Sequence, residues 1–447
     1  MKISFRYLLT AIFLVMGISL FAQNTQWREM HKVKKHETIF GIANEYGISI
    51  EELINCNPDM KQPGYQLKKG DYIFIPYAKG KHADNGVKSK SPTTTEKDIT
   101  KRAIKIGIML PLHDINGDGK RMTEYYRGIL LACEQLKKSG ISTDIRAWNI
   151  PENTDIRQTL LKENARTCDI IYGPLYSNMV NPLAEFCKTY DIKLVIPFSI
   201  TATDASYNPA VFQIYQSQED IHKQAINAFL NRFADRHVVF IDCNDKESDK
   251  GVFTFGLRQK LEAAGIDYSI TNLKSSEAMF AKAFNKNKAN VVVLNTGRSP
   301  ELNVAFAKIS NLIGYRVSLF GYTEWLMYEK YDAEEFFKYN TYIPTTFYYN
   351  PTSASTSSLE QIYRRSFGND MMQSLPRFAI TGYDHAMFFL TGMHKYGKKF
   401  TGDRRESTYQ PLQNPLHFVH IGNGGYKNKS FQLIHYTKYH TIESINF

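Results

Sequence analysis

The sequence predicts a multidomain chain: a small β-α-α-β module, then a large α/β part with parallel sheets arranged in two lobes. Residues 31–77 place two short amphipathic helix patterns between two strand patterns. Residues 78–102 are polar and basic, which is typical of a flexible linker. From residue 103 onward, apolar strand patterns alternate with helix patterns, as in parallel sheets covered by helices.

The N-terminal segment has the pattern of an export signal. Lys2 and Arg6 precede the apolar run Leu8–Ala22, which is short for a membrane span. We therefore expect residues 1–23 to be a signal peptide and the mature protein to reach the periplasm or cell envelope, associated with the wall. An uncleaved signal anchor is the alternative. No cysteine directly follows the run, so no lipid anchor is expected.

The small module begins with an expected strand over Lys32–Lys35. The Thr38 hydroxyl can cap a first helix, and Gly47 suits the left-handed residue that ends it. Ser49 and Glu52 have the spacing of a capping box, which predicts the start of a second helix. A closing strand is expected over Ile73–Pro76.

These residues resemble a LysM domain along the whole module. The matching positions are Val33, Thr38, Ile39, Ile42, Ala43, Tyr46, Gly47, Ile48, Ser49, Leu53, Asn57, Pro58, Leu67, Gly70, Ile73, Ile75 and Pro76. The resemblance implies binding of N-acetylglucosamine-containing glycans, chiefly peptidoglycan, in a groove between two loops. The implied groove residues are His36, Glu37, Thr38, Ile39 and Phe40 in one loop and Asn57, Pro58, Asp59 and Met60 in the other.

One pair departs from the family pattern. His36-Glu37 stands where the family usually has Gly-Asp, and this turn borders the implied groove. The departure bears on glycan affinity more than on the fold. A module retained for packing or for protein contact is the alternative.

Charge and cysteine content restrict the partners and the chemistry. The formal net charge of +11 and the pI of about 9.1 suit an anionic wall polymer or membrane surface, and the export signal argues against nucleic acid. An ordinary basic periplasmic protein fits the same charge. The five cysteines include no C-x-x-C pair, so neither a disulfide framework nor a zinc site is expected. A bridge between Cys168 and Cys187 remains open.

The large part resembles a type I periplasmic binding protein of the leucine-binding type. The motifs that carry the resemblance are IGIMLPL at 106–112, YYRGILLACEQLKKSG at 125–140, CDIIYGPLYSNMVNPLAEFCKTYDIKLVIPFSITAT at 168–203, Phe212–Gln218 and GYDHA at 382–386. The resemblance covers residues 103–447 and implies two lobes joined by three crossovers, expected near residues 215, 340 and 405. His417–Ile421 and Phe431–Tyr436 are predicted to form a terminal hairpin around Gly422–Gly425.

The resemblance also implies a ligand cleft between the lobes. The residues expected to line it are His113, Asp114, Ser177, Ser199, Thr201, Tyr215, Tyr322 and Glu324. The serines and the threonine equally suit helix capping after each strand. No acidic residue of the second lobe matches the group that holds an α-amine, which argues against an amino acid as the ligand.

No motif predicts catalysis, a metal or a cofactor. The sequence contains no G-x-S-x-G, P-loop or H-E-x-x-H pattern. Asp114–Gly119 resembles half of a calcium loop, but its twelfth position is Tyr125 instead of a bidentate acid.

We therefore expect a non-catalytic envelope protein whose LysM domain binds peptidoglycan or another N-acetylglucosamine glycan. Its larger domain is expected to sense a small solute or muropeptide, or to be a scaffold for an envelope protein of wall synthesis. The layout is similar to that of lipoprotein activators of penicillin-binding proteins. The alternative is the solute receptor of an amino-acid-type ABC transporter, although a wall tether does not suit a diffusing shuttle.

Overall fold

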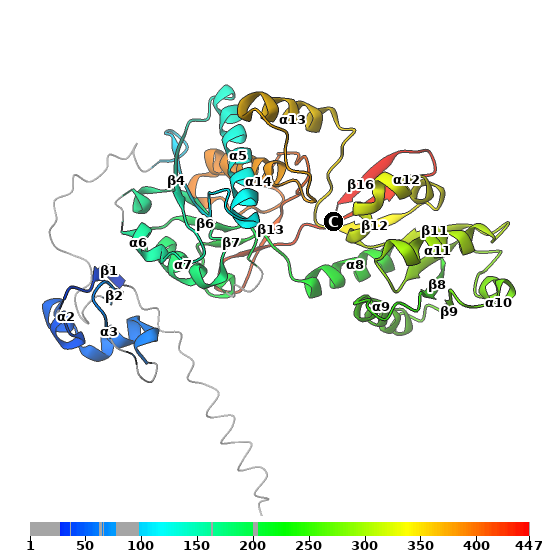
Figure 1. Cartoon of the computed structure of the whole chain (residues 1–447), viewed down its shortest axis with the longest axis horizontal. Helices are drawn as coiled ribbons and strands as arrows, with labels where there is room; N and C mark the ends of the chain where they lie inside the picture. The colour runs from blue at the N-terminus through cyan, green and yellow to red at the C-terminus, as the bar shows by residue number, and fades with distance from the viewer. Residues whose placement is uncertain are drawn as a thin grey trace, which may run out of the picture. The chain divides into compact units, whose positions relative to one another are not determined.

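The computed structural model describes residues 27–35, 37–61, 65, 67–76, 98–161, 164–199 and 204–446. The expected signal peptide and most of the expected linker lie outside these residues. Two compact units are present, one carrying the small module and one carrying two large sheets (Figure 1).

The small module has the expected β-α-α-β order. Its elements are β1 (Trp27–Lys32), α2 (Ile39–Glu45), α3 (Ile50–Cys56), the 3-10 turn η1 (Pro58–Lys61) and β2 (Tyr72–Pro76). β1 and β2 pair antiparallel, so that Met30 faces Phe74 and His31 faces Ile73. The first strand therefore lies earlier than the expected Lys32–Lys35, because its position is set by this pairing with β2.

The helix ends of the module follow the predicted local chemistry. The Ser49 side chain accepts a hydrogen bond from the Glu52 backbone, and the Glu52 carboxylate accepts one from the Ser49 backbone, so the capping box is confirmed. Gly47 has φ +64°, the left-handed conformation expected at a helix end. The helices and strands enclose a small core of Val33, Ile42, Ala43, Ile48, Leu53, Met60, Ile73 and Ile75.

The first large sheet has seven strands in the order β13-β14-β7-β6-β5-β3-β4. Its strands are β3 (Ile104–Leu110), β4 (Thr143–Asn149), β5 (Ile170–Tyr172), β6 (Lys193–Ile196), β7 (Val211–Gln213), β13 (Phe418–His420) and β14 (Tyr426–Asn428). All neighbouring strands are parallel except β13 and β14, which form a hairpin. The helices that follow these strands or return to this lobe are α5 (Gly117–Lys138), α6 (Ile156–Leu160), α7 (Val180–Thr189), α13 (Ala354–Phe367) and α14 (Phe378–Tyr396).

The second large sheet also has seven strands, in the order β16-β15-β12-β11-β10-β8-β9. Its strands are β8 (His237–Asp242), β9 (Tyr268–Asn272), β10 (Asn290–Leu294), β11 (Val317–Phe320), β12 (Tyr342–Thr345), β15 (Gln432–Tyr436) and β16 (Ile442–Asn446). β8 to β12 are parallel, and β15 and β16 add an antiparallel edge. The associated helices are α8 (Gln218–Phe233), α9 (Gly251–Ala263), α10 (Glu277–Lys282), α11 (Ser299–Ser310) and α12 (Glu329–Lys338).

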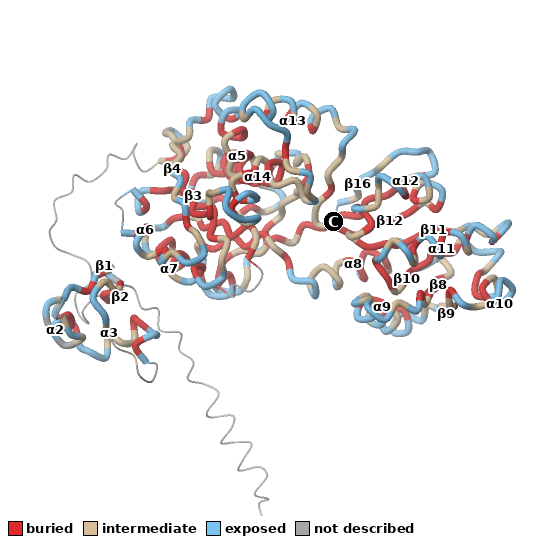
Figure 2. The backbone as a smooth tube through the Cα atoms, viewed as in Figure 1, coloured by how far each residue is buried: buried red, intermediate tan, exposed pale blue. Residues whose placement is uncertain are grey.

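The core of each lobe lies along its central strands. Every residue of β5 in the first sheet and of β10 in the second is buried, whereas the exposed positions fall mainly on helices and loops (Figure 2). The prediction of a small module joined to an α/β part with two parallel-sheet lobes is confirmed.

The chain passes between the two sheets three times, at 214–217, 346–353 and 429–431. The third passage is not near residue 405, where the sequence placed it. The chain stays in the first lobe beyond residue 405 because the buried carboxylate of Asp384 holds the loop at 412–414 there. This carboxylate accepts hydrogen bonds from the backbone of Leu412, Gln413 and Asn414. The predicted hairpin of 417–421 with 431–436 is also wrong, since β13 pairs with β14 and β15 pairs with β12.

Two helices of the first lobe pack unusually closely. A Cβ on Gly128 of α5 would lie 1.9 Å from the Ala379 carbonyl oxygen of α14, and one on Gly382 would lie 2.0 Å from the Tyr125 carbonyl oxygen. Only glycine allows this approach at these two positions. The pair fixes where α14 presents its side chains.

Candidate functional site

The first loop of the LysM module is closed by a hydrogen-bonded cluster. Glu37 Oε2 accepts from the Lys34 backbone at 2.7 Å and lies 2.8 Å from His31 Nε2. His31 Nδ1 lies 2.9 Å from the Tyr46 hydroxyl. The hydrogen bond with His31 has the largest effect on the pKa of the Glu37 carboxyl, and it lowers that pKa together with the bond from the Lys34 backbone. The carboxylate is therefore committed to shaping the loop, while its neighbour His36 lies outside the described residues.

The remaining predicted groove residues divide into structural and exposed ones. Asn57 is buried, and its side-chain amide exchanges hydrogen bonds with the Phe74 backbone and donates to the Leu53 carbonyl. Met60 belongs to the core, and Ile39 packs against it. Met60, Ile39 and Asn57 thus support the two loops from the side of the core.

Three predicted residues expose their side chains on the module: Thr38, Pro58 and Asp59. Thr38 also caps α2, because its Oγ1 accepts from the Gly41 backbone at 3.0 Å. The side chain of Phe40 is outside the described part of the structure.

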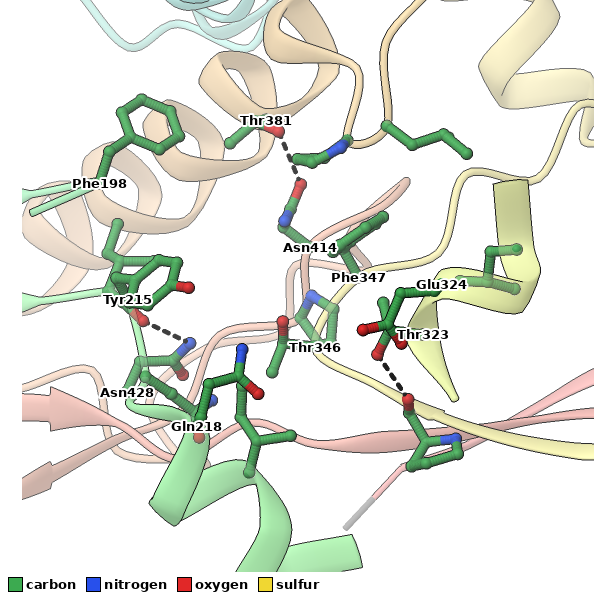
Figure 3. A pocket seen from close by; sticks show the side chains of 18 of the residues that line it. Phe198, Tyr215, Gln218, Thr323, Glu324, Thr346, Phe347, Thr381, Asn414 and Asn428 are labelled. Carbon is green, nitrogen blue, oxygen red and sulfur yellow. Dashed lines mark hydrogen bonds between the residues drawn. The ribbon is translucent and has the colours of Figure 1, made fainter. Parts of the chain in front are cut away.

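The large unit contains a cavity of about 400 Å³. Side chains of both lobes line it, together with the first two passages and the start of α14 (Figure 3). Its apolar lining includes Phe198, Ile214, Ile221, Phe253, Leu326, Met327, Phe347, Leu375, Phe378 and Leu416. Its polar lining includes Gln216, Gln218, His222, Lys250, Thr323, Glu324, Thr346, Thr381, His385, Asn414 and Asn428.

Three of the predicted cleft residues line this cavity: Tyr215, Tyr322 and Glu324. Ser177 and Ser199 do not line it; their hydroxyl oxygens lie 2.9 Å apart and bond to each other. The lining also excludes His113, which sits against Gly119, and the exposed Asp114. Thr201 lies outside the described residues.

Sequence reasoning missed the contribution of α14. Phe378, Thr381 and His385 follow one another at spacings of three and four, so they share one face of that helix. This helical spacing is the feature of the sequence from which their shared face could have been predicted. The loop residue Asn414 joins them: its Oδ1 accepts from Thr381 Oγ1 at 3.0 Å, and its amide nitrogen lies on the opposite side of the group (Figure 3).

The charged lining residues pair with each other. Lys250 Nζ donates to Glu324 Oε1 at 2.6 Å and to Asp249 at 3.0 Å, and it lies 5.3 Å from the Tyr322 ring centroid. Burial alone would lower the pKa of Lys250, but these acceptors outweigh burial and raise it. Burial, aided by the Lys250 charge, lowers the pKa of His222, which favours its neutral form.

His385 is the most buried titratable group of the lining, with 1% of its surface exposed. Its Nδ1 lies 2.9 Å from the Tyr125 hydroxyl, and burial lowers its pKa to about 3. The imidazole is therefore neutral at physiological pH. Its Nε2 is buried and has no hydrogen-bond partner within the part of the chain that the structure describes.

The described residues show no sign of a metal site, a membrane-spanning helix or a disulfide. Among them, no three His, Cys, Asp or Glu side chains gather in a way that could hold a metal ion. None of their helices combines the length and apolar character needed to cross a bilayer. The five cysteines are buried and unbridged in the structure.

Comparison with known proteins agrees with this architecture. The LysM domain family matches residues 31–76. A putative branched-chain amino acid ABC transporter protein from Rhodospirillum rubrum superposes with a TM-score of 0.53 at 12% identity, covering 77% of this chain and 100% of its own. Residues 31–76 are therefore a LysM domain. At 12% identity the structural likeness shows the fold alone, so the large unit has the fold of a type I periplasmic binding protein.

Two further solved structures match less closely. An ABC transporter substrate-binding protein from Desulfitobacterium hafniense in complex with Leu has a TM-score of 0.40 and 16% identity, covering 77% of this chain and 100% of its own. LpoA from Haemophilus influenzae has a TM-score of 0.49 and 15% identity, covering 77% of this chain and 59% of its own. No curated protein matches the sequence.

Proposed function

We propose that this chain is a non-catalytic protein of the cell envelope that is held on peptidoglycan by its LysM domain and binds a small molecule in the cavity of its large unit. The LysM domain at residues 31–76 is the observation that carries the proposal. LysM domains as a class imply binding of N-acetylglucosamine glycans. The signal-like N-terminal sequence is consistent with export to the compartment that contains such glycans.

The module supports glycan binding by its construction. The buried Asn57 amide ties α3 to β2, and the Glu37 cluster fixes the other loop, so both groove loops are held from beneath. Thr38, Pro58 and Asp59 are exposed and lie outside the module's core, and Asp59 Oδ2 also lies 3.5 Å from Arg157 Nη2. A shallow, rigid surface of this kind needs no catalytic group to hold acetamido sugars.

The cavity supports binding of a small molecule over a purely scaffolding role. Its volume of about 400 Å³ falls within the usual range for small-molecule sites, and it combines apolar walls with a few polar groups. A scaffold has no need for such a space between its lobes. If no small molecule binds in the cavity, the alternative is that the large unit is a scaffold for a protein of wall synthesis.

Peptidoglycan sedimentation of the intact chain tests the LysM assignment. Soluble N-acetylglucosamine oligomers are expected to release the protein from insoluble peptidoglycan. Matched cellulose oligomers, which have the same linkage but lack acetamido groups, are the control and should release little. Equal release by both sugars, or retention that neither sugar changes, would contradict the glycan assignment.

A further inference from the structure

This inference rests on the proposed binding at the cavity and concerns the chemistry of its ligand. We propose that the cavity takes an uncharged molecule with an apolar body and a hydrogen-bonding group, and that Nε2 of His385 is the contact at its buried end. Neither a zwitterionic amino acid nor an organic anion fits this description.

The charge arrangement argues for an uncharged ligand. Among the described lining residues, the charged groups are Lys250 and Glu324, whose Nζ and Oε1 atoms lie 2.6 Å apart. Lys250 Nζ also lies 3.0 Å from Asp249 Oδ1, so two carboxylates already balance its charge. A zwitterion or an organic anion would lose hydration in the cavity without gaining an unpaired cation among these lining residues. An uncharged ligand leaves the pair intact.

The walls argue for an apolar body. The rings of Phe198, which follows β6, and Phe378, at the start of α14, lie 5.6 Å apart at their centroids. Phe347 and Leu375 extend the apolar wall along the second passage and the loop before α14. Aromatic and aliphatic surface of this extent favours rings or chains of matching shape.

His385 provides the hydrogen-bonding end. Its Nδ1 is occupied by the Tyr125 hydroxyl at 2.9 Å, while its Nε2 is buried and unpartnered among the described residues. A buried polar atom without a partner is costly, so a ligand group that bonds to Nε2 gains affinity. The neutral ring can donate or accept at Nε2, according to which tautomer the Tyr125 bond selects.

Gln218, at the start of α8, lines the cavity (Figure 3) and is exposed to solvent. His385, by contrast, is almost fully buried. A bulky side chain at position 218 therefore blocks entry without disturbing the core.

A matched pair of fluorescent probes tests the ligand class on the intact chain. N-phenyl-1-naphthylamine is uncharged, and 1-anilinonaphthalene-8-sulfonate carries the same ring skeleton with an added anion. We expect saturable, one-to-one binding of the uncharged probe, with at least tenfold weaker binding of the sulfonate. L-leucine is expected not to displace the bound probe.

Two substitutions on one helix locate the binding. Gln218→Trp should abolish probe binding by filling the mouth. Asn227→Trp places the same residue at an exposed position of α8 that does not line the cavity, and should leave binding unchanged. If both variants bind like the parent chain, the probe is elsewhere, and both the cavity function and the ligand class are overturned.

His385→Phe tests the polar contact, using N-phenyl-1-naphthylamine as a donor probe and 1-acetylnaphthalene as an acceptor probe. Loss of one hydrogen bond should weaken one of the two by about three- to tenfold. His385→Phe alone leaves the buried Tyr125 hydroxyl without its histidine partner. The double variant Tyr125→Phe/His385→Phe removes that hydroxyl as well, and it should fold normally and show the same loss of probe affinity. Unchanged affinity for both probes in both variants overturns the role of His385.

The two proposals fail in different ways. Preferential binding of the sulfonate or of L-leucine, blocked by Gln218→Trp, refutes the uncharged class but keeps the cavity as a small-molecule site. Such a result for L-leucine would favour a transport receptor.

Discussion

At the scale of single residues, a neutral histidine in an enclosed site has a thermodynamic consequence. Burial lowers the pKa of His385 to about 3, whereas an unfolded histidine titrates near 6.5. Between these values the unfolded chain binds more protons than the folded chain, so acid favours unfolding. The stability associated with neutral His385 is present above about pH 6.5 and is lost as the pH falls toward 3.

We therefore predict that the free energy of unfolding falls more steeply with acid in the parent chain than in His385→Phe. Between pH 7 and pH 4.5 the extra loss should be about 2 kcal/mol, measured by urea unfolding of the large unit. The adjacent Asp384, whose pKa burial raises to about 6, acts in the opposite direction in the same range. Its effect is common to both proteins, so the difference between them isolates His385. Parallel pH profiles would show that His385 is not held neutral.

At the scale of elements, the placement of the cavity depends on how closely α5 and α14 approach. The α14 face that carries Phe378, Thr381 and His385 is positioned by the contacts of Gly128 and Gly382 with the opposing helix. Asp384, on the same helix, holds the loop that carries Asn414. One helix thus organises most of the first lobe's contribution to the cavity.

Gly128→Ala is predicted to destabilise the large unit by about 1–3 kcal/mol, because the new methyl group would collide with the Ala379 carbonyl. It should also weaken probe binding by displacing α14. The control is Gly251→Ala at the first residue of α9, where an added Cβ meets no atom within 4 Å. Urea unfolding should show the control unchanged or slightly more stable; equal destabilisation by both would remove the close approach as the cause.

The elements of the fold differ in how far the sequence predicts them. The LysM helices could be predicted because their signals are local: the Ser49–Glu52 box and Gly47 need only neighbouring residues. Strand-helix alternation was sufficient for the two lobes. The third passage and the cavity wall could not be predicted, because both depend on hydrogen bonds between Asp384 and a loop much later in the chain, such as the one with Asn414, which is 30 residues away. Of the predicted cleft residues, Tyr215, Tyr322 and Glu324 lie on the lining, but Ser177 and Ser199 satisfy each other instead.

At the scale of the whole molecule, the contacts define two compact units with different proposed ligands. Each unit has its own core. Binding to one folded unit stabilises that unit by mass action.

Calorimetry of the intact chain is therefore expected to resolve two unfolding transitions. N-acetylglucosamine oligomers should raise the midpoint of the LysM transition alone, and N-phenyl-1-naphthylamine should raise that of the large unit alone. Cellulose oligomers are the control for the first shift, and the Gln218→Trp variant is the control for the second. A single transition that both ligands shift equally would mean that the units unfold as one.

The interleaved strand order has a consequence for biosynthesis. β13 and β14 complete the first sheet, and β15 and β16 complete the second, so residues 418–446 supply edge strands to both. A nascent chain emerging from the ribosome in sequence order leaves both sheets with unpaired edges until this segment appears. Neither lobe can complete its sheet before this segment is synthesised, so both lobes are vulnerable to a late premature stop.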